Sequence, residues 1–369
     1  MTNVPSPYRV NFFNELGKEC DLTVTFEKKN SDERGDTWGN YKFENFKGVF
    51  LKGVSISTDT AICFDIKKVI KKGKFDRIIC ANFTSPTGMI AIEYMRKKRI
   101  PYYLESDGGI AKDGKGFKEK IKKHFIFGAE GYFSTSMLHD GYYTAYGAPK
   151  MKLIRYPFTS LYEKDISDNI PTKEEKISLR GKLGITEEKV VISVGRFSYL
   201  NGYGKGYDVL LRAAKKLDEN IGWYIVGGQP TEEFVQLTKE SGLKNIHYID
   251  FKGKEELKEY YKASDLFVLM TVSDVWGLVV NEAMSNGLPV ITTDKCVAGV
   301  ELVKEGENGF ILPVGDDEGL AKKVETFFAD ESKAEEMAKN ALETIRPYTI
   351  ENMANTHVQV FEKLAKKGL

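Results

Sequence analysis

The sequence predicts an α/β protein with two doubly wound domains, each built around a parallel sheet. Short runs rich in Val, Ile, Phe and Tyr alternate with amphipathic helical stretches, and a polar stretch interrupts this alternation near the middle of the chain. A length of 369 residues suits two domains of ordinary size. Apolar residues make up 41% and charged residues 29%, which provides a core and a solvated surface and excludes disordered and fibrous classes.

In the first half, residues 1–165, five apolar runs have the length and composition of strands. They are Leu22–Phe26, Val49–Leu51, Arg77–Asn82, Tyr102–Glu105 and Gly131–Ser134. Helical patterns between them include Ser85–Lys98 and Met137–Tyr146. A helix is expected around Val10–Leu16, close to where a doubly wound domain has its first strand. We therefore expect the first strand of this domain to be short or missing.

The second half, residues 183–347, repeats the alternation more regularly. Its expected strands are Val190–Val194, Trp223–Val226, Ile246–Ile249, Leu266–Met270, Val290–Thr292 and Gly309–Leu312. Its expected helices include Tyr207–Leu217, Glu232–Ser241, Lys254–Ala263 and Leu278–Ser285. Near-continuous apolar strands that alternate with helices predict a parallel sheet covered on both faces. Residues 166–182 are polar and contain Pro171, so we interpret them as a linker.

The two halves differ in charge, although the whole chain has a net charge of only +1. Residues 1–165 contain 28 Lys and Arg against 20 Asp and Glu, whereas residues 166–369 contain 26 against 33. A basic domain attracts anionic partners. No apolar run approaches the roughly 18 residues that cross a bilayer, the first residues lack a secretion signal, and the four cysteines are scattered. We therefore expect a cytoplasmic protein.

Two cations follow the first strand of the second half. Parallel α/β sheets bind ligands beyond the carboxyl ends of their strands. Gly195-Arg196 comes directly after Val190–Val194, and Lys205-Gly206 comes just before the next helix. Glycines allow close backbone approach, a helix N-terminus attracts anions, and two cations can converge on a diphosphate. The alternative interpretation is a glycine-rich surface turn with two solvated bases.

Two carboxylates follow the strand Leu266–Met270. Asp274 lies in the loop after this strand, and Glu282 lies about one turn inside the next helix. A carboxylate in either place can accept hydrogen bonds from the vicinal diol of a ribose or a hexose. Gly277 would let a ligand approach the backbone closely. The alternative is that Asp274 only caps the helix and that Glu282 is solvated.

The first half carries weaker signals. Glu105 and Asp107 lie at the carboxyl end of the strand Tyr102–Glu105, and we take Asp107 as the candidate for bonding a sugar hydroxyl. The alternative is an ordinary Asp-Gly turn at the end of a strand. His124 and His139 have no partner that the sequence reveals, so we expect both to be surface histidines.

A basic amphipathic helix is predicted after this turn. Phe117, Ile121 and Phe125 recur at helical spacing. Lysines fill the other faces of the helix: Lys118, Lys120, Lys122 and Lys123. Such a helix can lie on an anionic membrane and approach a lipid-linked acceptor, or its apolar residues can pack on the sheet while the lysines stay solvated. Two further basic clusters lie in the same half, Lys67–Lys74 and Arg96–Arg99. Nucleic acid is not an expected partner, because these basic clusters lack stacking aromatics in a recognisable module and the second half is acidic.

Several motifs in the second half follow one another in a family-specific order. They are Gly195-Arg196, Lys205-Gly206, Ser264–Val268, the acidic-x7-Glu pattern that ends at Glu282, Gly287–Ile291 and Asn308–Phe310. Through them, residues 190–315 resemble the donor domain of retaining glycosyltransferase family 4. The resemblance implies the GT-B architecture, in which two Rossmann-like domains face a central cleft. It also implies that a C-terminal helix, residues 348–369, crosses back to the first domain.

The resemblance also implies a site. A nucleotide sugar would place its diphosphate on Arg196 and Lys205 and its ribose on Glu282. The family usually has Glu where this chain has Asp274, which leaves the identity of the donor sugar open. The implied donor-binding residues are Gly195, Arg196, Lys205, Asp274, Trp276, Gly277, Leu278 and Glu282. The catalytic candidates are Arg196, Lys205, Asp274 and Asp107.

Residues of this site can stabilise the negative charge of a leaving diphosphate. The chain has no Asp-x-Asp motif, so Arg196, Lys205 and the helix dipole would stabilise the departing diphosphate without a metal or other cofactor. The resulting expectation is a retaining hexosyltransferase that uses a UDP-sugar rather than GDP-mannose. Its acceptor would be a glycan or a lipid-linked oligosaccharide in cell-surface polysaccharide assembly at the inner membrane face. The alternatives are a sugar-nucleotide epimerase of the same fold and a catalytically degenerate, nucleotide-sugar-binding partner subunit.

Overall fold

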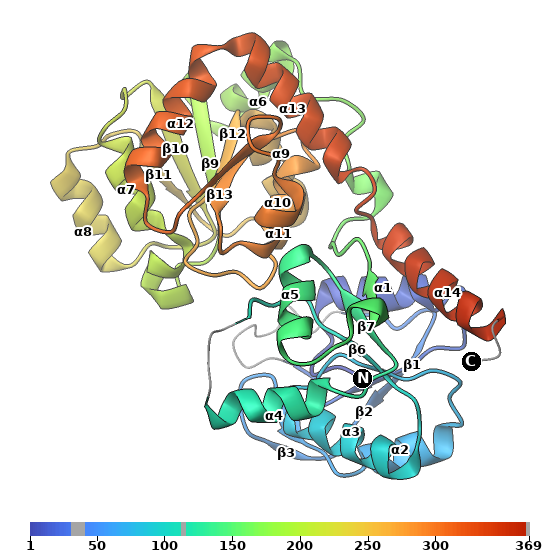
Figure 1. Cartoon of the computed structure of the whole chain (residues 1–369). Helices are drawn as coiled ribbons and strands as arrows, with labels where there is room; N and C mark the ends of the chain where they lie inside the picture. The colour runs from blue at the N-terminus through green and yellow to red at the C-terminus, as the bar shows by residue number, and fades with distance from the viewer. Residues whose placement is uncertain (31–40, 112–115, 367–369) are drawn as a thin grey trace. The chain divides into compact units, whose positions relative to one another are not determined.

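The computed structural model describes residues 1–30, 41–111 and 116–366, and the chain forms two compact units (Figure 1). Unit 1 comprises Met1–Tyr162 and Tyr348–Leu369, and unit 2 comprises Glu163–Pro347. Both units contain parallel sheets with helices packed on them. The predicted α/β class is therefore confirmed. None of the helices in the described ranges is both long and apolar enough to cross a membrane.

Unit 2 is organised by one six-stranded parallel sheet in the order β11-β10-β9-β12-β13-β14. Its strands are β9 (Lys189–Val194), β10 (Ile221–Val226), β11 (Ile246–Ile249), β12 (Leu266–Leu269), β13 (Val290–Thr293) and β14 (Gly309–Leu312). Strands β10 and β11 extend the sheet on one side of β9, and strands β12, β13 and β14 extend it on the other side. The neighbours β9 and β12 therefore form the topological switch point, where sheets of this type bind ligands.

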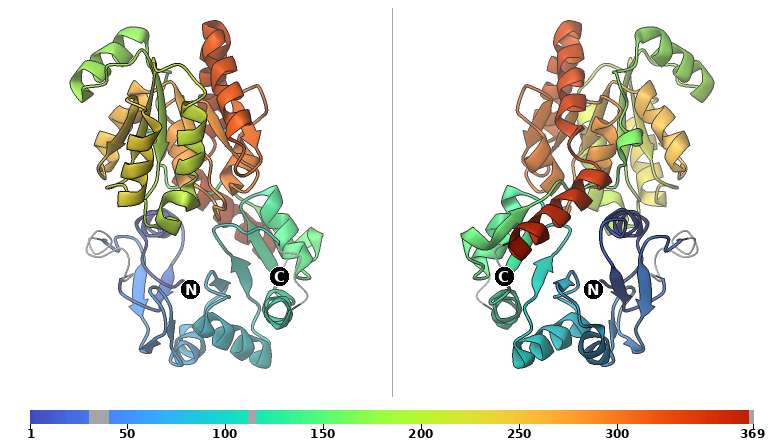
Figure 2. Two further views of the ribbon diagram at one scale, coloured as in Figure 1. Left: turned by 90° about the vertical axis from the view of Figure 1, so that its left-hand side faces the viewer. Right: turned by 90° about the vertical axis from the view of Figure 1, so that its right-hand side faces the viewer.

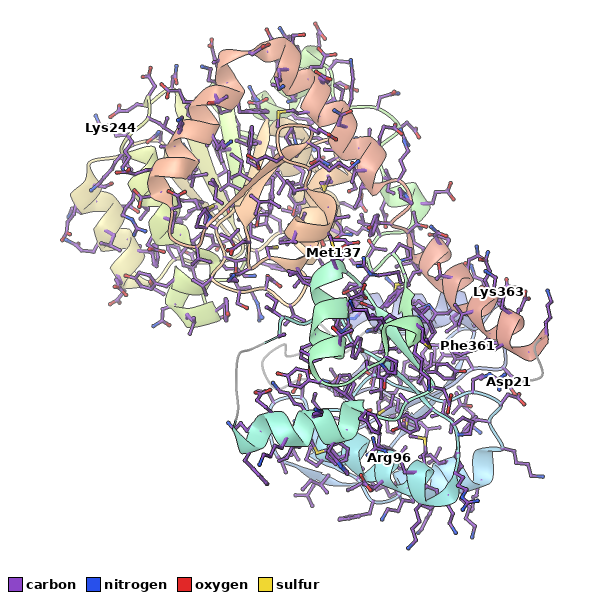
Figure 3. The ribbon with its side chains drawn as sticks, in the orientation of Figure 1. Asp21, Arg96, Met137, Lys244, Phe361 and Lys363 are labelled. Carbon is purple, nitrogen blue, oxygen red and sulfur yellow. The ribbon has the colours of Figure 1, made fainter. Side chains whose placement is uncertain are left out.

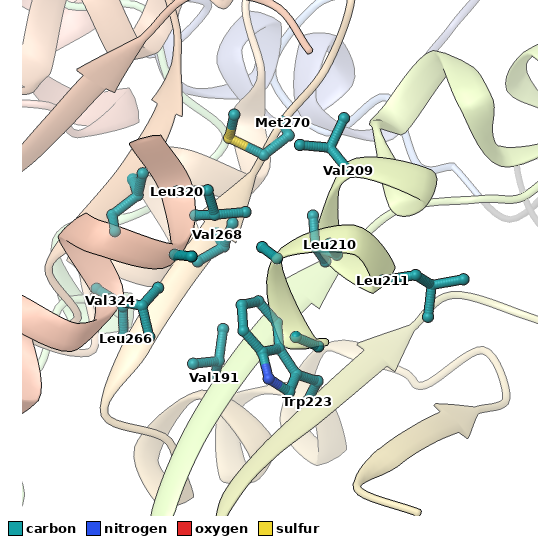
Figure 4. Close-up of a cluster of buried hydrophobic side chains, with 14 of the residues drawn as sticks. Val191, Val209, Leu210, Leu211, Trp223, Leu266, Val268, Met270, Leu320 and Val324 are labelled. Atoms are coloured by element: carbon teal, nitrogen blue, oxygen red, sulfur yellow. The ribbon is translucent and has the colours of Figure 1, made fainter. Parts of the chain in front are cut away.

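Helices cover both faces of this sheet (Figure 1). They are α6 (Lys173–Leu183), α7 (Tyr207–Ala214), α8 (Glu232–Ser241), α9 (Lys254–Ala263), α10 (Leu278–Met284), α11 (Val297–Leu302), α12 (Asp317–Ala329) and α13 (Glu331–Ile345). Apolar side chains of α7 and α12 pack with those of β9, β10 and β12 around the buried Trp223 (Figure 4). This core holds the carboxyl ends of β9 and β12 in place.

The segment interpreted as a linker is partly helical. Residues 173–183 form α6, which begins with a capping box between Thr172 and Glu175 and belongs to unit 2. The helix has no buried residue. It is attached by polar contacts instead, because Lys176 and Arg180 both bind Asp265 at 2.8 Å. The polar composition of residues 173–183 therefore belongs to a helix that is attached by ion pairs, and these residues do not form an extended linker.

Unit 1 contains a four-stranded parallel sheet and two smaller pairs of strands. The sheet has the order β5-β6-β7-β8, with β5 (Ile79–Cys80), β6 (Tyr103–Glu105), β7 (Gly131–Ser134) and β8 (Leu153–Arg155). The pairs are β1 (Thr23–Phe26) with β2 (Lys47–Phe50), and β3 (Val54–Ser55) with β4 (Ala61–Ile62). Its helices are α1 (Pro7–Leu16), α2 (Ile66–Gly73), α3 (Pro86–Lys98), α4 (Phe117–Ile126), α5 (Met137–Ala145) and α14 (Ile350–Lys366).

Residues 1–3 lie between β1 and β5 in the position of a short central strand. The amino group of Met1 donates to the Ile79 carbonyl, and the Met1 carbonyl accepts from the Ala81 N–H, both at 2.9 Å. On the other side, the Thr2 N–H donates to the Thr25 carbonyl at 3.0 Å. These bonds connect the β1-β2 pair to the four-stranded sheet.

The last helix, α14, belongs to unit 1 and packs against α1 (Figures 1 and 2). The buried His357 ring stacks on Phe133 of β7, with the ring centroids 4.3 Å apart. Phe361, which is labelled in Figure 3, lies edge-on to Tyr103 at 5.1 Å. The C-terminal helix α14 thus contributes side chains to the core of unit 1, the unit that also contains the N-terminal residues.

A buried ion pair links α1 to the end of β6. Arg9 and Glu105 are only 4% and 3% exposed, and their side chains meet at 2.5 Å. The Tyr156 hydroxyl donates to the same Glu105 carboxylate at 3.1 Å. Burial works to raise the pKa of Glu105, but the charge of Arg9, and with it the nearby His357 ring, holds this pKa well below its usual range. The carboxylate therefore stays ionised inside the unit.

Replacing Arg9 by Met would leave the charge of Glu105 buried and unpaired. We expect the free energy of unfolding to fall by about 3–5 kcal/mol, as measured by urea denaturation followed by circular dichroism. The double variant R9M/E105Q removes the unpaired charge and should recover part of this loss. A loss below about 1 kcal/mol for R9M would show that the pair contributes little to stability.

Candidate functional site

The loops that follow β9 and β12 are bonded to each other at the switch point of unit 2. The Thr271 hydroxyl and the Val272 N–H both donate to the Gly204 carbonyl, at 2.9 and 3.1 Å. Gly206 has a left-handed φ of 74°, and a Cβ on it would lie only 2.0 Å from the Met270 carbonyl oxygen. Only glycine allows this approach, so the loop is held directly over the end of β12.

A lysine and an aspartate, one from each loop, form an ion pair at this place. Lys205 Nζ lies 2.7 Å from Asp274 Oδ2, and the side chains are 18% and 20% exposed. The same ammonium lies 5.7 Å from the centre of the Tyr199 ring. The structure thus brings together two of the predicted catalytic residues and leaves their charges within reach of a ligand.

Gly195 and Arg196 begin the first of these loops. The Gly195 N–H donates to the Val226 carbonyl at 2.9 Å, and its carbonyl accepts from the Tyr207 hydroxyl at 2.5 Å. Arg196 is exposed and has no acidic partner in the part of the chain that the structure describes. Its guanidinium is therefore available to an external anion.

The second loop is fixed by its backbone and by one buried aromatic side chain. The Asp274 N–H donates to the Lys295 carbonyl at 3.0 Å. Trp276 is 3% exposed, and its indole N–H donates to Asn281 Oδ1 at 2.8 Å. Gly277 has a φ of 101°, and a Cβ on it would lie 2.8 Å from Cys296 Sγ. Trp276 and Gly277 therefore shape the loop, and the polar end of the indole is already engaged by a protein group.

Leu278 and Glu282 lie on α10, at its first residue and one turn later. Leu278 is half-buried. The Tyr261 hydroxyl on α9 donates to Glu282 Oε2 at 3.2 Å. Burial raises the pKa of Glu282 to about 7, against the lowering effects of Tyr261 and of Lys254, while Asp165 raises it further. Glu282 is therefore partly protonated at neutral pH when no ligand is present.

In unit 1, both oxygens of Asp107 are held by residues of α1. The Tyr8 hydroxyl donates to Oδ2 at 2.5 Å, and the Arg9 guanidinium binds Oδ1. A third of the Asp107 side chain is exposed. Tyr8 and Arg9 do not belong to the predicted site residues. Arg9 lies 98 residues before Asp107, and only the fold brings the two together.

His139 corrects an expectation, because it is not a surface histidine. It is fully buried on α5 and stacks on Tyr143 with ring centroids 4.3 Å apart. The Thr135 N–H donates to Nδ1 at 3.2 Å, so Nε2 carries the proton and faces the Ser106 hydroxyl at 2.8 Å. Burial lowers the pKa of His139 to about 3. His124, by contrast, is exposed.

The basic helix α4 packs only partly on unit 1. Phe125 packs against the core, Ile121 is half-buried, and Phe117 is 77% exposed. Lys122 lies 3.3 Å from Glu119. The other three predicted lysines are exposed: Lys118, Lys120 and Lys123. The packing interpretation therefore holds for Phe125 and in part for Ile121, whereas Phe117 stays exposed. Contact of this helix with a membrane stays a prediction.

Two polar residues that the sequence analysis missed are bonded to predicted site elements of unit 2. Thr271 ties the two loops together, and Tyr261 bonds Glu282. Thr271 could have been found, because it directly follows a strand at the edge where ligands bind. Tyr261 gave no such signal, because nothing in the periodicity of a helix shows which neighbouring helix its hydroxyl will meet.

Within the described ranges, no group of three or more His, Cys, Asp or Glu side chains is placed to hold a metal ion. Metal independence itself stays a prediction.

Known proteins resemble both the sequence of unit 2 and the fold of the whole chain. Residues 175–344 match the family model of glycosyl transferases group 1. An uncharacterized glycosyltransferase of Methanocaldococcus jannaschii is 29% identical over 196 residues, which cover 51% of this chain and 49% of that protein. The lipopolysaccharide core biosynthesis glycosyltransferase LpsE of Rhizobium meliloti is 28% identical over 157 residues, covering 42% of this chain and 44% of that protein.

Among solved structures, HepE of Anabaena in complex with UDP aligns with a TM-score of 0.75 at 16% identity, over 99% of each chain. Its complex with UDP-glucose aligns with a TM-score of 0.72 over 99% of each chain. The predicted fold of two Rossmann-like domains, as in GT-B glycosyltransferases, is thus confirmed. The aligned segment spans about half the length of the curated relatives. The match to glycosyl transferases group 1 covers residues 175–344, which is less than half of the chain.

The buried His139 generates a prediction on acid stability. Its pKa is lower in the folded chain than the unfolded value of about 6.5, so the unfolded chain takes up the proton first as the pH falls. We expect the free energy of unfolding to decrease as the pH falls from about 6.5 towards about 3, the pKa of His139 in the folded chain. Replacing His139 by Gln should flatten this part of the stability curve, measured by urea denaturation at a series of pH values.

If H139Q and the wild-type chain lose stability in parallel over this pH range, His139 does not carry the acid sensitivity.

Proposed function

We propose that the chain is a glycosyltransferase that takes a sugar from a nucleoside diphosphate, with UDP-sugars as donors. The observation that carries the proposal is the arrangement at the switch point of unit 2. There Arg196 is exposed and unpaired among the described residues, and Lys205, at the end of the same loop, is partly exposed and paired with Asp274. The family-model match over the same unit and the UDP complexes of a protein with the same fold support this proposal.

The proposed reaction places the diphosphate on Arg196 and Lys205. As the bond between the anomeric carbon and the diphosphate oxygen breaks, negative charge grows on the leaving group, and the two cations stabilise it. The acceptor oxygen forms its bond on the same face of the sugar, and its proton passes to the departing diphosphate. Configuration is then retained, and neither a separate base nor a metal is required.

Carboxylates would recognise the sugar parts of the donor and the acceptor. Glu282 would accept hydrogen bonds from the ribose diol, and Asp274 would contact the transferred hexose once the diphosphate engages Lys205. In unit 1, Tyr8 and Arg9 orient Asp107, and its exposed part can accept a hydrogen bond from a sugar hydroxyl.

The proposed acceptor is a glycan or a lipid-linked oligosaccharide of the cell surface. The similarity to a lipopolysaccharide core glycosyltransferase supports this class of acceptor. The basic charge of residues 1–165 supports peripheral association with an anionic membrane.

Titration with UDP tests the nucleotide site, with Glu282→Ala as the variant. We expect UDP to bind the wild-type chain without metal and more tightly than GDP, in calorimetry with and without magnesium. Loss of the carboxylate that accepts from the ribose should weaken binding about 10- to 100-fold. Failure of both nucleotides to bind the wild-type chain would contradict the donor site itself.

The raised pKa of Glu282 adds a pH dependence with a definite sign. The carboxylate is lost as the pH falls through about 7, so affinity should decrease below that pH. UDP-glucose is the suitable ligand, because its diphosphate does not titrate in this range. The conservative variant Glu282→Gln should bind UDP-glucose with little pH dependence, and a wild-type pH profile in E282Q would remove Glu282 from the site.

The ion pair at the switch point predicts an unusual gain of affinity. Asp274 competes with a diphosphate for Lys205, so Asp274→Asn should tighten UDP binding about two- to fivefold while lowering sugar transfer. The matched control is K205M against K205M/D274N: without the lysine, removal of the carboxylate should change UDP binding little. Weaker UDP binding by D274N, or an equal gain in the K205M background, would contradict the competition.

A further inference from the structure

A pocket opens between the carboxyl ends of α2 and α3 in unit 1, where these helices lie side by side (Figures 1 and 2). Its volume is about 420 Å³, which is within the range of small-molecule sites. Five apolar or aromatic side chains form its walls: Ile70, Phe75, Ile78, Tyr94 and Ile100. All five belong to the core of unit 1 or pack against it. The pocket is therefore a place where this core is open to the surface.

Three lysines border this pocket: Lys71, Lys74 and Lys98. All three are exposed, and none has an acidic partner among residues 1–30, 41–111 and 116–366. Other bases on the same two helices are likewise unpaired within those ranges: Lys68, Lys72, Lys97 and Arg99. The rim is thus positively charged while the interior is apolar.

Two acidic side chains at the start of α2 and on α3 are bonded to groups outside the pocket. The Asp65 carboxylate accepts from the Lys52 N–H at 2.9 Å. Glu93 binds Arg96 of its own helix and His124 of α4. Arg96, labelled in Figure 3, also donates to the carbonyls of His124 and Phe127, so it joins α3 to α4 and does not face the pocket as a free cation. The exposed Asp76 lies next to Phe75 in the sequence, but it forms no ion pair with the three rim lysines in the described part of the chain. The rim therefore keeps a net positive charge.

Basic residues at helix C-termini have a general explanation, because they oppose the negative end of the helix dipole. The dipole does not explain why both helices end in a charged residue with left-handed backbone, Lys74 at a φ of 46° and Arg99 at 54°. Glycine is the usual residue in that conformation. Nor does the dipole explain an apolar pocket between the two ends.

We propose that this pocket binds an anionic phospholipid of a bilayer. Its phosphate would lie between the three rim lysines, and the first methylene groups of an acyl chain would contact the apolar walls. The rest of the lipid stays in the membrane, so the ends of α2 and α3 face the bilayer. The proposal assigns membrane contact to these helices and not to the lysines of α4, and it uses none of the residues of the proposed donor site.

Vesicle sedimentation with two triple variants tests this assignment. The pocket variant is K71S/K74S/K98S, and the matched control on α4 is K118S/K120S/K123S. Vesicles of phosphatidylcholine with and without phosphatidylglycerol are used at low salt. Each lysine near an anionic surface contributes about a fivefold gain in partitioning. We expect the pocket variant to lose about 100-fold of its binding to the anionic vesicles and the α4 variant to lose much less.

Equal losses for the two variants, or wild-type binding by the pocket variant, would overturn the proposal. The thermal transitions of both variants should match that of the wild-type chain, because all six positions are exposed. The measurement contains no nucleotide, so a negative result would leave the proposed donor site standing, and failure of UDP binding would leave the lipid pocket standing.

A second titration separates a lipid from free phosphate. Octyl phosphate, below the concentration at which it forms micelles, should bind the wild-type chain at least about tenfold more tightly than inorganic phosphate, because only the former buries methylene groups. The pocket variant should bind neither. Equal affinity of the wild-type chain for the two compounds would show that the rim binds phosphate alone and would overturn the assignment to a lipid.

Discussion

The site of unit 2 depends on the close contact between the loops that follow β9 and β12. The sheet order reverses between these strands, so no crossover helix separates their carboxyl ends. Gly206 closes the remaining distance, because its α-carbon lies where any Cβ would collide with the Met270 carbonyl. This close approach positions the preceding residue, Lys205, to form its ion pair with Asp274. A larger side chain at position 206 would push the loops apart and separate the two charges.

Ion pairs at strand ends serve different purposes in the two units. In unit 1 the pair of Arg9 and Glu105 is almost fully buried, so breaking it is costly, and the same guanidinium also binds the neighbouring Asp107. In unit 2 the pair of Lys205 and Asp274 remains partly exposed. Water and ligands can therefore compete for those charges at low cost.

Features that depend on residues close together in the sequence could be predicted, whereas features that depend on contacts between distant residues could not. The strands of unit 2 carry continuous apolar runs, and all six were located from them. The short strands β3, β4 and β8 have only two or three residues and depend on neighbours that periodicity does not reveal. The polar composition of α6 indicates a linker, because this helix is attached by ion pairs and not by apolar residues, although the capping box at Thr172 marks its start.

By itself, the sequence determined the α/β class, the strand-ending loops and the charged residues those loops carry, because each depends on local composition and on the rule that ligands bind at carboxyl ends. Only the tertiary structure decided which of those charges meet. It paired Lys205 with Asp274, placed Tyr8 and Arg9 on Asp107, and buried His139. These contacts join residues far apart in the chain, and their distances are set by strand order and core packing, which no local pattern encodes.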